Sequence, residues 1–211
     1  MASNSMNYKL FDPPFRLDFA EMSPGQAGRY FDWFIEHKSL RIEELRRLVS
    51  REKQGQDVLD YSRASLAALG AWFDTQIRTR PLRPDELARD RADAPAWLHE
   101  YLPTATFTPR TFSICMDAGI YIAEVMRRHH PKLRWDFVRE PRSHADLHQP
   151  VLVPFLNGHL NAFAIMVVIA AKVNEGKTAA TVLPETFAVW EDLVPPQDRP
   201  ARRKPHSSRS N

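Results

Sequence analysis

One stretch of the sequence carries acidic, phenolic and basic side chains at helical spacing. Asp117, Tyr121, Glu124 and Arg128 follow one another at steps of four, three and four residues, and Ser113 extends the row by four. At about 100° per residue, these side chains share one stripe of a helix. A partly buried pair of carboxylates can share a proton or raise the pKa of one member. The plainer interpretation, which we favour from the sequence, is a solvated helix edge.

The stripe supports two functional hypotheses. An enzyme would use Asp117 and Glu124 as an acid–base pair and Tyr121 as a proton donor, with Arg128 or Arg134 binding an anionic substrate. A non-enzymatic binding protein would use the same five side chains to hold a protein partner. Aspartate has poor propensity in the middle of a helix, so a tertiary partner is expected for Asp117 in either case.

The polar loop at residues 139–149 is assigned to the same working surface. It contains His144, Asp146 and His148. Two histidines four residues apart on a helix can ligate zinc with a third ligand. Here they lie in a proline-bounded loop, without the glutamate of an HExxH motif between them. Metal binding by His144 and His148 is therefore the lesser alternative, and no cofactor is expected.

The stripe belongs to a helix predicted between Thr108 and Pro131. Thr108 is an N-cap residue followed by proline at the first helical position. Pro131 ends the helix because proline lacks the amide donor and excludes helix from the residue before it. Apolar side chains occupy roughly two thirds of its circumference, which indicates burial on several sides.

The remaining elements surround this central helix. Alternating apolar residues predict strands around 133–138 and 151–155 that pair across the loop. A helix is expected from Ser23, with a break near 37–39, and an apolar helix over 162–173 is expected to be buried all round. The fold class is α+β: a mostly helical single domain with a small antiparallel sheet packed against the buried central helix.

Composition places the chain among ordinary globular proteins. Its 211 residues are 43% hydrophobic and 26% charged, enough for a sizeable core. We predict one domain over residues 7–194 and a basic disordered tail over 195–211. Much of the net charge of +3 lies in that tail. Weak nucleic-acid contact through the tail is a further alternative, but the tail has no interleaved aromatics.

Several functional classes lose their usual support. The sequence has no Walker A, GxGxxG, GxSxG or CxxC pattern. Its single cysteine excludes an internal disulfide. The N-terminus lacks the charged and apolar regions of a secretion signal, and the longest apolar run is too short to span a bilayer. A cytoplasmic location without membrane contact is expected.

Four segments carry a resemblance to a known group of proteins. They read YFDWF, RIEEL, DAGIYIAEVMRRHHPKLRW and PVLVPF. The chain resembles a family of small uncharacterised bacterial proteins with a DxGIYxAEVxRRxxPxLxW motif, associated with toxin-immunity loci. The resemblance implies an immunity-type or accessory protein that binds a protein partner, possibly a toxin, and it brings no catalytic residues. Immunity proteins are often acidic, and this chain is not.

Overall fold

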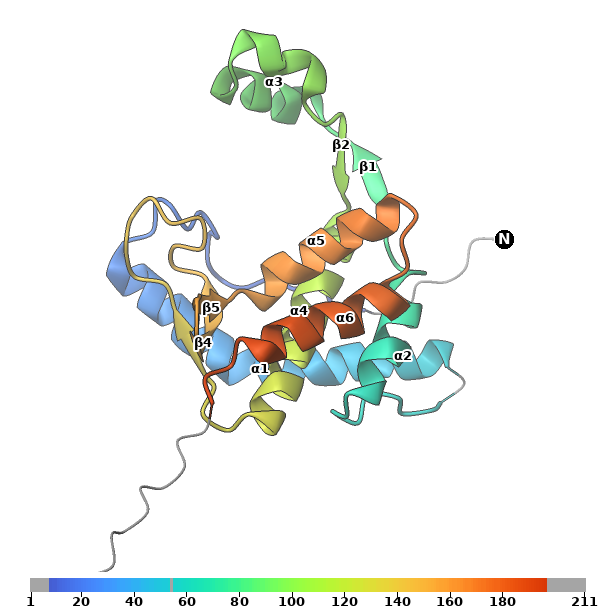
Figure 1. The fold of residues 1–211 in the computed structure, drawn as a ribbon. Coiled ribbons are helices and arrows are strands. Elements are labelled where there is room, and N and C mark those ends of the chain that lie inside the picture. The colour runs from blue at the N-terminus through green and yellow to red at the C-terminus, as the bar shows by residue number, and fades with distance from the viewer. Residues whose placement is uncertain (1–7, 54, 197–211) are drawn as a thin grey trace, which may run out of the picture.

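The computed structural model describes residues 8–53 and 55–196. The chain forms a mostly helical α+β fold with two small antiparallel sheets (Figure 1). The elements are α1 (Pro24–Glu52), α2 (Ala64–Phe73), β1 (Thr79–Pro81), α3 (Pro84–Asp93), the 3₁₀ helix η1 (Ala96–Tyr101), β2 (Ala105–Phe107), α4 (Pro109–His129), β3 (Arg134–Phe137), β4 (Pro150–Phe155), β5 (Gly158–Leu160), α5 (Ala162–Asn174) and α6 (Ala179–Asp192). The basic residues of the predicted tail lie outside the described ranges.

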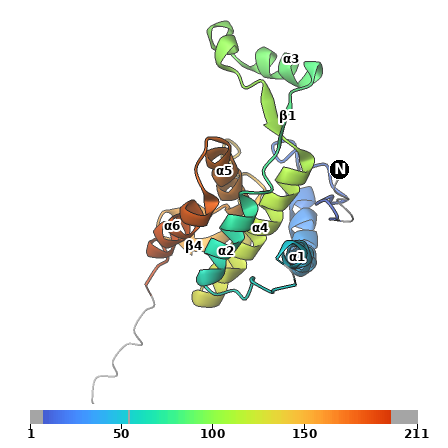
Figure 2. The same cartoon turned by 90° about the vertical axis from the view of Figure 1, so that its right-hand side faces the viewer.

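Helix α4 is the centre of the molecule, and its predicted ends are confirmed. Thr108 caps it by accepting a hydrogen bond from the Thr111 amide. The helix lies between α1 on one side and α5 on the other, as Figure 2 shows. Ser113, Asp117 and Glu124 are buried, so the solvated helix edge that the sequence suggested is wrong for these residues, whereas Arg128 of the same stripe is exposed.

Helix α1 runs without the expected break near 37–39. Ser23 and Gln26 form a capping box at its start. His37 continues the helix, with its Nδ1 2.8 Å from the Trp33 carbonyl oxygen. Lys38 reaches Glu124 on α4. Lys38 thus lies on the side of α1 that packs against the stripe.

The larger sheet is antiparallel, in the order β3-β4-β5. Trp135 pairs with Leu152, and Leu152 pairs with Leu160. Leu152 and Leu160 belong to the same hydrophobic cluster as the apolar side of α4. This confirms the predicted small sheet beside the central helix, with β5 as its third strand.

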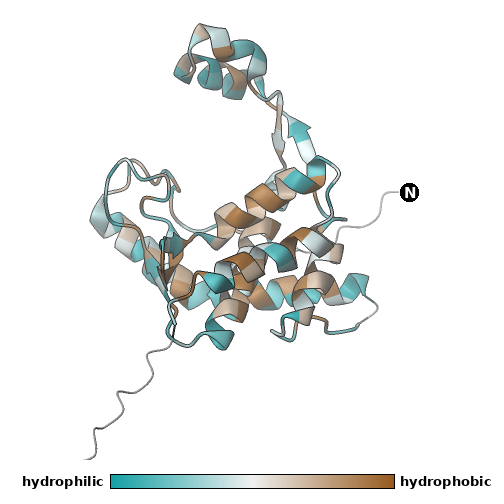
Figure 3. Ribbon diagram, in the orientation of Figure 1, coloured by the Kyte–Doolittle hydropathy of each residue, from teal (hydrophilic) through white to brown (hydrophobic). Residues whose placement is uncertain are grey.

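Helix α5 is only partly buried, contrary to the expectation from its apolar sequence. Met166, Ile169 and Ala170 are buried, whereas Val168 on the outer side is 55% exposed. The apolar residues gather where α4, α5 and α6 pack together (Figure 3). None of the helices among the described residues is long and apolar enough to cross a membrane.

Residues 79–107 form a projecting arm that stands away from the rest of the molecule (Figures 1 and 2). Strands β1 and β2 pair as its stem, and α3 and η1 form its tip. Neither α3 nor η1 contains a buried residue. Trp97 and Tyr101 are 73% and 70% exposed there.

Residues 8–22 form an N-terminal strap that lies on α1 and α4. The Lys9 amide donates to Glu44 on α1, and the Phe11 amide donates to the Ser113 hydroxyl on α4. At the other end of the strap, the Phe19 carbonyl accepts a hydrogen bond from His148 Nδ1 at 2.9 Å. The strap is therefore fastened to the folded body at both ends.

Candidate functional site

Asp117 lies in a buried ion pair with Arg41 of α1. Arg41 donates from Nε to Oδ1 at 2.8 Å and from Nη2 to Oδ2 at 2.7 Å, and Tyr8 of the strap donates its hydroxyl to Oδ2 at 2.5 Å. Arg41 Nη2 also donates to the Lys9 carbonyl. The tertiary partner expected for Asp117 is thus an arginine that holds the beginning of the strap at the same time.

Burial governs the protonation of this cluster. It raises the pKa of Asp117 to about 6, although the hydrogen bonds from Arg41 and Tyr8 act in the opposite direction. Burial and the neighbouring carboxylate raise the pKa of Tyr8, so its hydroxyl stays protonated as a donor. Asp117 is therefore a carboxylate at neutral pH, and each of its oxygens is already engaged.

Glu124 is held by three donors. Trp135 Nε1 donates to Oε1 at 2.7 Å, and Lys38 and Arg127 reach the same oxygen at 2.9 and 3.3 Å. Burial raises the pKa of Glu124, but the hydrogen bonds from Trp135 and Lys38 outweigh it and leave the pKa below its usual value. Glu124 thereby fixes the indole of Trp135.

The other members of the predicted site are dispersed. Tyr121 is fully buried, and its hydroxyl lies 2.6 Å from Ser65 Oγ. The Arg128 guanidinium stacks over the Tyr61 ring at 3.3 Å. Arg134 is exposed. The two carboxylates and Tyr121 do not converge on an open cleft, so the geometric condition for the acid–base hypothesis is not met.

A cavity of about 530 Å³ lies next to the stripe, beneath the strap, and Ser113 of the stripe is among its lining residues. Its walls are mainly apolar and come from the strap, α1, α4, β3 and α5. The lining residues are Leu10, Phe11, Asp12, Leu17, Phe19, Tyr30, Phe34, Pro109, Phe112, Ser113, Met116, Gly119, Ile120, Trp135, Gln149, Pro150, Asn161, Ala162 and Phe163. Pockets of this size and composition are typical of small-molecule sites.

The floor of the cavity depends on close contact between α4 and α5. A Cβ atom on Gly119 would lie 2.9 Å from the carbonyl oxygen of Ala162, closer than side-chain carbons approach backbone atoms. Glycine lets the two helices meet here. The buried stripe supports the same cavity, because Asp117 fastens the strap that covers it and Glu124 fixes Trp135 in its wall.

Tyr30 lines the cavity, but its hydroxyl is buried away from the accessible space. Its side chain is fully buried, and its hydroxyl is the one buried side-chain polar atom without a hydrogen-bond partner among the described residues. Burial raises its pKa, so the group is a neutral donor. Leaving such a donor unpaired costs about 1–3 kcal/mol. Asn161 and Gln149 add amide groups to the lining.

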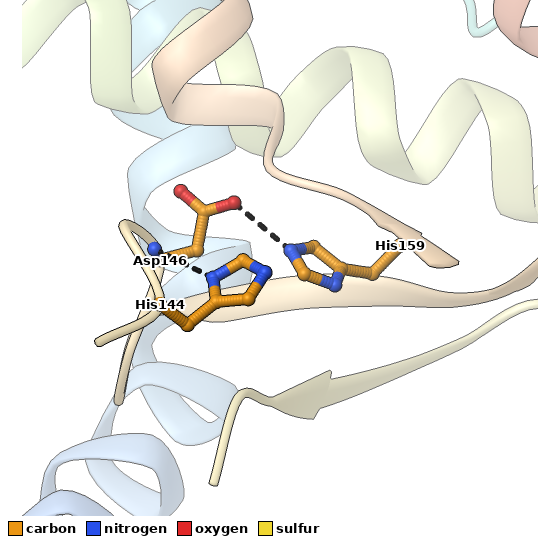
Figure 4. Close-up of side chains that lie close together, drawn as sticks. All are labelled: His144, Asp146 and His159. Atoms are coloured by element: carbon orange, nitrogen blue, oxygen red, sulfur yellow. Dashed lines mark hydrogen bonds and ion pairs between the residues drawn. The ribbon is translucent and has the colours of Figure 1, made fainter. Parts of the chain in front are cut away.

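The predicted metal pair is not brought together. His148 is buried and donates to the strap. His144 instead meets Asp146 and His159, with one potential ligand atom from each residue within 4.8 Å of the others (Figure 4). We call these three residues the histidine cluster. Sequence reasoning missed His159 because it lies in β5, outside the loop, and nothing in its spacing links it to His144.

Comparison of the chain with protein-family models, with curated proteins and with solved structures gives no match. The resemblance to a bacterial family therefore stays a prediction.

Proposed function

We propose that the protein binds a neutral, largely apolar small molecule in the cavity beneath the strap. The observation that carries this proposal is a cavity of about 530 Å³ whose walls are mainly apolar. An apolar ligand would fill this space. Its burial favours binding, because each Å² of apolar surface removed from water contributes about 25 cal/mol.

The charge of the lining selects the ligand class. Among the described residues that line the cavity, Asp12 is charged and none is cationic. An anionic head group such as a fatty-acid carboxylate would find no counter-ion there and would pay for desolvation. The favoured ligand is thus uncharged and largely apolar.

Two fluorescent probes of similar size test this selection. N-phenyl-1-naphthylamine is neutral, whereas 8-anilino-1-naphthalenesulfonate is anionic. We expect the neutral probe to bind saturably with enhanced fluorescence, and the anionic probe to bind at least about tenfold more weakly, a difference of about 1.4 kcal/mol. Equal affinity for the two probes would contradict the assignment of the ligand class.

A matched pair of substitutions locates the binding. Met116→Trp places an indole in the cavity wall, whereas Leu40→Trp places one on the exposed side of α1, where Leu40 is 61% exposed. The first variant should weaken binding of the neutral probe by tenfold or more, and the second should leave it unchanged. Loss of binding in both variants, or in neither, would place the probe elsewhere.

A second candidate function is binding of a protein partner, as an immunity-type or accessory protein. The projecting arm supports it, because Trp97 and Tyr101 expose large aromatic surfaces at its tip. Such side chains are enriched at interaction hot spots. The buried stripe is not available for this role, so the arm replaces it as the proposed surface.

The test of this second candidate is a pull-down from the native host. The wild-type chain should recover one partner in stoichiometric amount, and a double variant, Trp97→Ser with Tyr101→Ser, should lose it. A matched control changes Leu156→Ser, a similarly exposed apolar residue in the turn after β4. Recovery of no stoichiometric partner, or equal recovery by all three chains, would count against it.

A further inference from the structure

The histidine cluster combines ligands that first-row transition metals prefer. It offers two imidazole rings and one carboxylate, a set that suits Zn²⁺ and related divalent ions and that Mg²⁺ and Ca²⁺ do not favour. His144 and Asp146 come from the polar loop, and His159 comes from β5. The centroids of the His144 and His159 rings lie 5.0 Å apart, and the Asp146 carboxylate lies beside the rings (Figure 4).

We propose that His144, Asp146 and His159 bind a divalent transition-metal ion, with Zn²⁺ as the best-fitting probe. Ligand atoms at about 2.0–2.2 Å from a tetrahedral Zn²⁺ are separated by about 3.3–3.6 Å. The three ligand atoms lie within 4.8 Å of one another, so side-chain movements of about 1 Å close the site. Three protein ligands leave a fourth position open for water or another molecule.

The surroundings hold the carboxylate as a metal site requires. Oδ2 of Asp146 accepts from His159 Nε2 at 2.9 Å, and Oδ1 accepts from Asn161 Nδ2 at 2.8 Å. Asn161 is itself fixed, because its Oδ1 caps α5 through the Ala164 amide. Because His159 is itself a proposed ligand, the outer contact to this carboxylate is that of Asn161. Such a contact orients a ligating carboxylate, and its removal typically changes metal affinity by about 10–100-fold.

The cluster is also accessible to an ion. The side chains of His159 and Asp146 are 18% and 24% exposed. An ion held here would cross-link the loop to β5. It would also lie close to the polar part of the cavity lining, since Asn161 contacts Asp146 and lines the cavity with Gln149.

Metal capture displaces hydrogen bonds that the cluster makes without an ion, including the one from His159 Nε2 to Asp146 Oδ2 if that nitrogen ligates. The Asp146 amide donates to His144 Nδ1 at 3.0 Å, and the other ring nitrogen, Nε2, is directed toward His159 (Figure 4). A neutral ring that ligates through Nε2 carries its proton on Nδ1, which can then no longer accept that amide. Metal binding therefore breaks the hydrogen bond from the Asp146 amide.

Calorimetric titration of the chelator-treated full chain with Zn²⁺ tests the proposal. We expect one saturable equivalent in the wild type and at least about tenfold weaker binding in Asp146→Asn and in His159→Gln. Mg²⁺ should give no saturable signal. The control is His99→Gln, which removes a histidine from the projecting arm and should leave the affinity for Zn²⁺ unchanged.

The amide of Asp146 gives a readout that adventitious zinc would not move. Its NMR resonance should shift as Zn²⁺ saturates the wild-type protein, because the amide loses its acceptor. Asp146→Asn keeps the shape of the side chain, so the variant should fold. Circular dichroism verifies this before titration. Wild-type affinity in both cluster variants, or an unmoved Asp146 amide at saturation, overturns the proposal.

Discussion

Removing the same phenolic oxygen at two positions should change the stability of this protein in opposite directions. Tyr30→Phe removes a buried hydroxyl without a partner among the described residues. Tyr8→Phe removes a hydroxyl that donates to the Asp117 carboxylate at 2.5 Å. The substitutions are chemically identical, so the side-chain entropy and the aromatic ring are matched between them.

The expected magnitudes follow from these two environments. An unsatisfied buried donor costs about 1–3 kcal/mol, and a small loss of packing offsets part of the gain, so Tyr30→Phe should raise the free energy of unfolding by about 1–2 kcal/mol. A hydrogen bond to a charged group contributes about 1.5–3 kcal/mol, so Tyr8→Phe should lower the free energy of unfolding by that amount. For a chain of this length, each kcal/mol shifts Tm by roughly 2–4 °C.

Urea unfolding of the ligand-free protein, followed by circular dichroism, measures both changes. The slope of the free energy against urea concentration should stay constant, so that the midpoints report stability alone. If Tyr30→Phe lowered the midpoint, the Tyr30 hydroxyl would have to be hydrogen-bonded, and the expectation of an unpaired buried donor would be wrong. Shifts of the same sign in the two variants would refute the reasoning as well.

Three further predictions concern the buried helices. Asp117→Asn should lower the free energy of unfolding by about 3–5 kcal/mol, because it leaves a buried guanidinium unpaired, and a loss below 1 kcal/mol in urea melts would contradict this. Burial raises the pKa of Glu124, but the hydrogen bonds from the Trp135 indole and Lys38 together outweigh it and hold the pKa below its usual 4.5. The contribution of Glu124 to the free energy of unfolding is therefore complete above pH 4.5 and is lost as the pH falls through the lowered pKa. Glu124→Gln should accordingly make the Tm less sensitive to acid in thermal melts. Gly70→Ala would place a Cβ atom 2.3 Å from a carbonyl oxygen of α6 and should cost about 1–3 kcal/mol or more, whereas Gly28→Ala, where no atom lies within 4 Å, should be neutral or stabilising in the same denaturation assay.

The sequence was a good guide to local structure. Helix α4 begins and ends where Thr108 and Pro131 predict, because capping and proline chemistry act over a few residues. The alternation around Trp135 and Leu152 likewise identified two paired strands. The break expected near 37–39 was wrong, because the polar residues there include Lys38, which contacts the buried carboxylate of Glu124.

The candidate site could not be predicted in the same way. Its cavity is bounded by segments far apart in the chain, from Phe11 in the strap to Phe163 in α5. No periodicity encodes how such segments meet. The polar stripe drew attention for its chemistry, but the Arg41 partner of Asp117 lies 76 residues away in the sequence. A row of charged residues on a buried helix can form structural ion pairs as well as a catalytic site.

The stem of the projecting arm has a consequence for how this chain can vary. Thr79 and Phe107 are directly paired, so the polypeptide leaves the helical body and returns to it at adjacent points. The tip contributes no buried side chain to the core. Insertions, deletions or whole-segment grafts between these two residues should leave the rest of the architecture intact, so this segment can be exchanged without redesign of the interior.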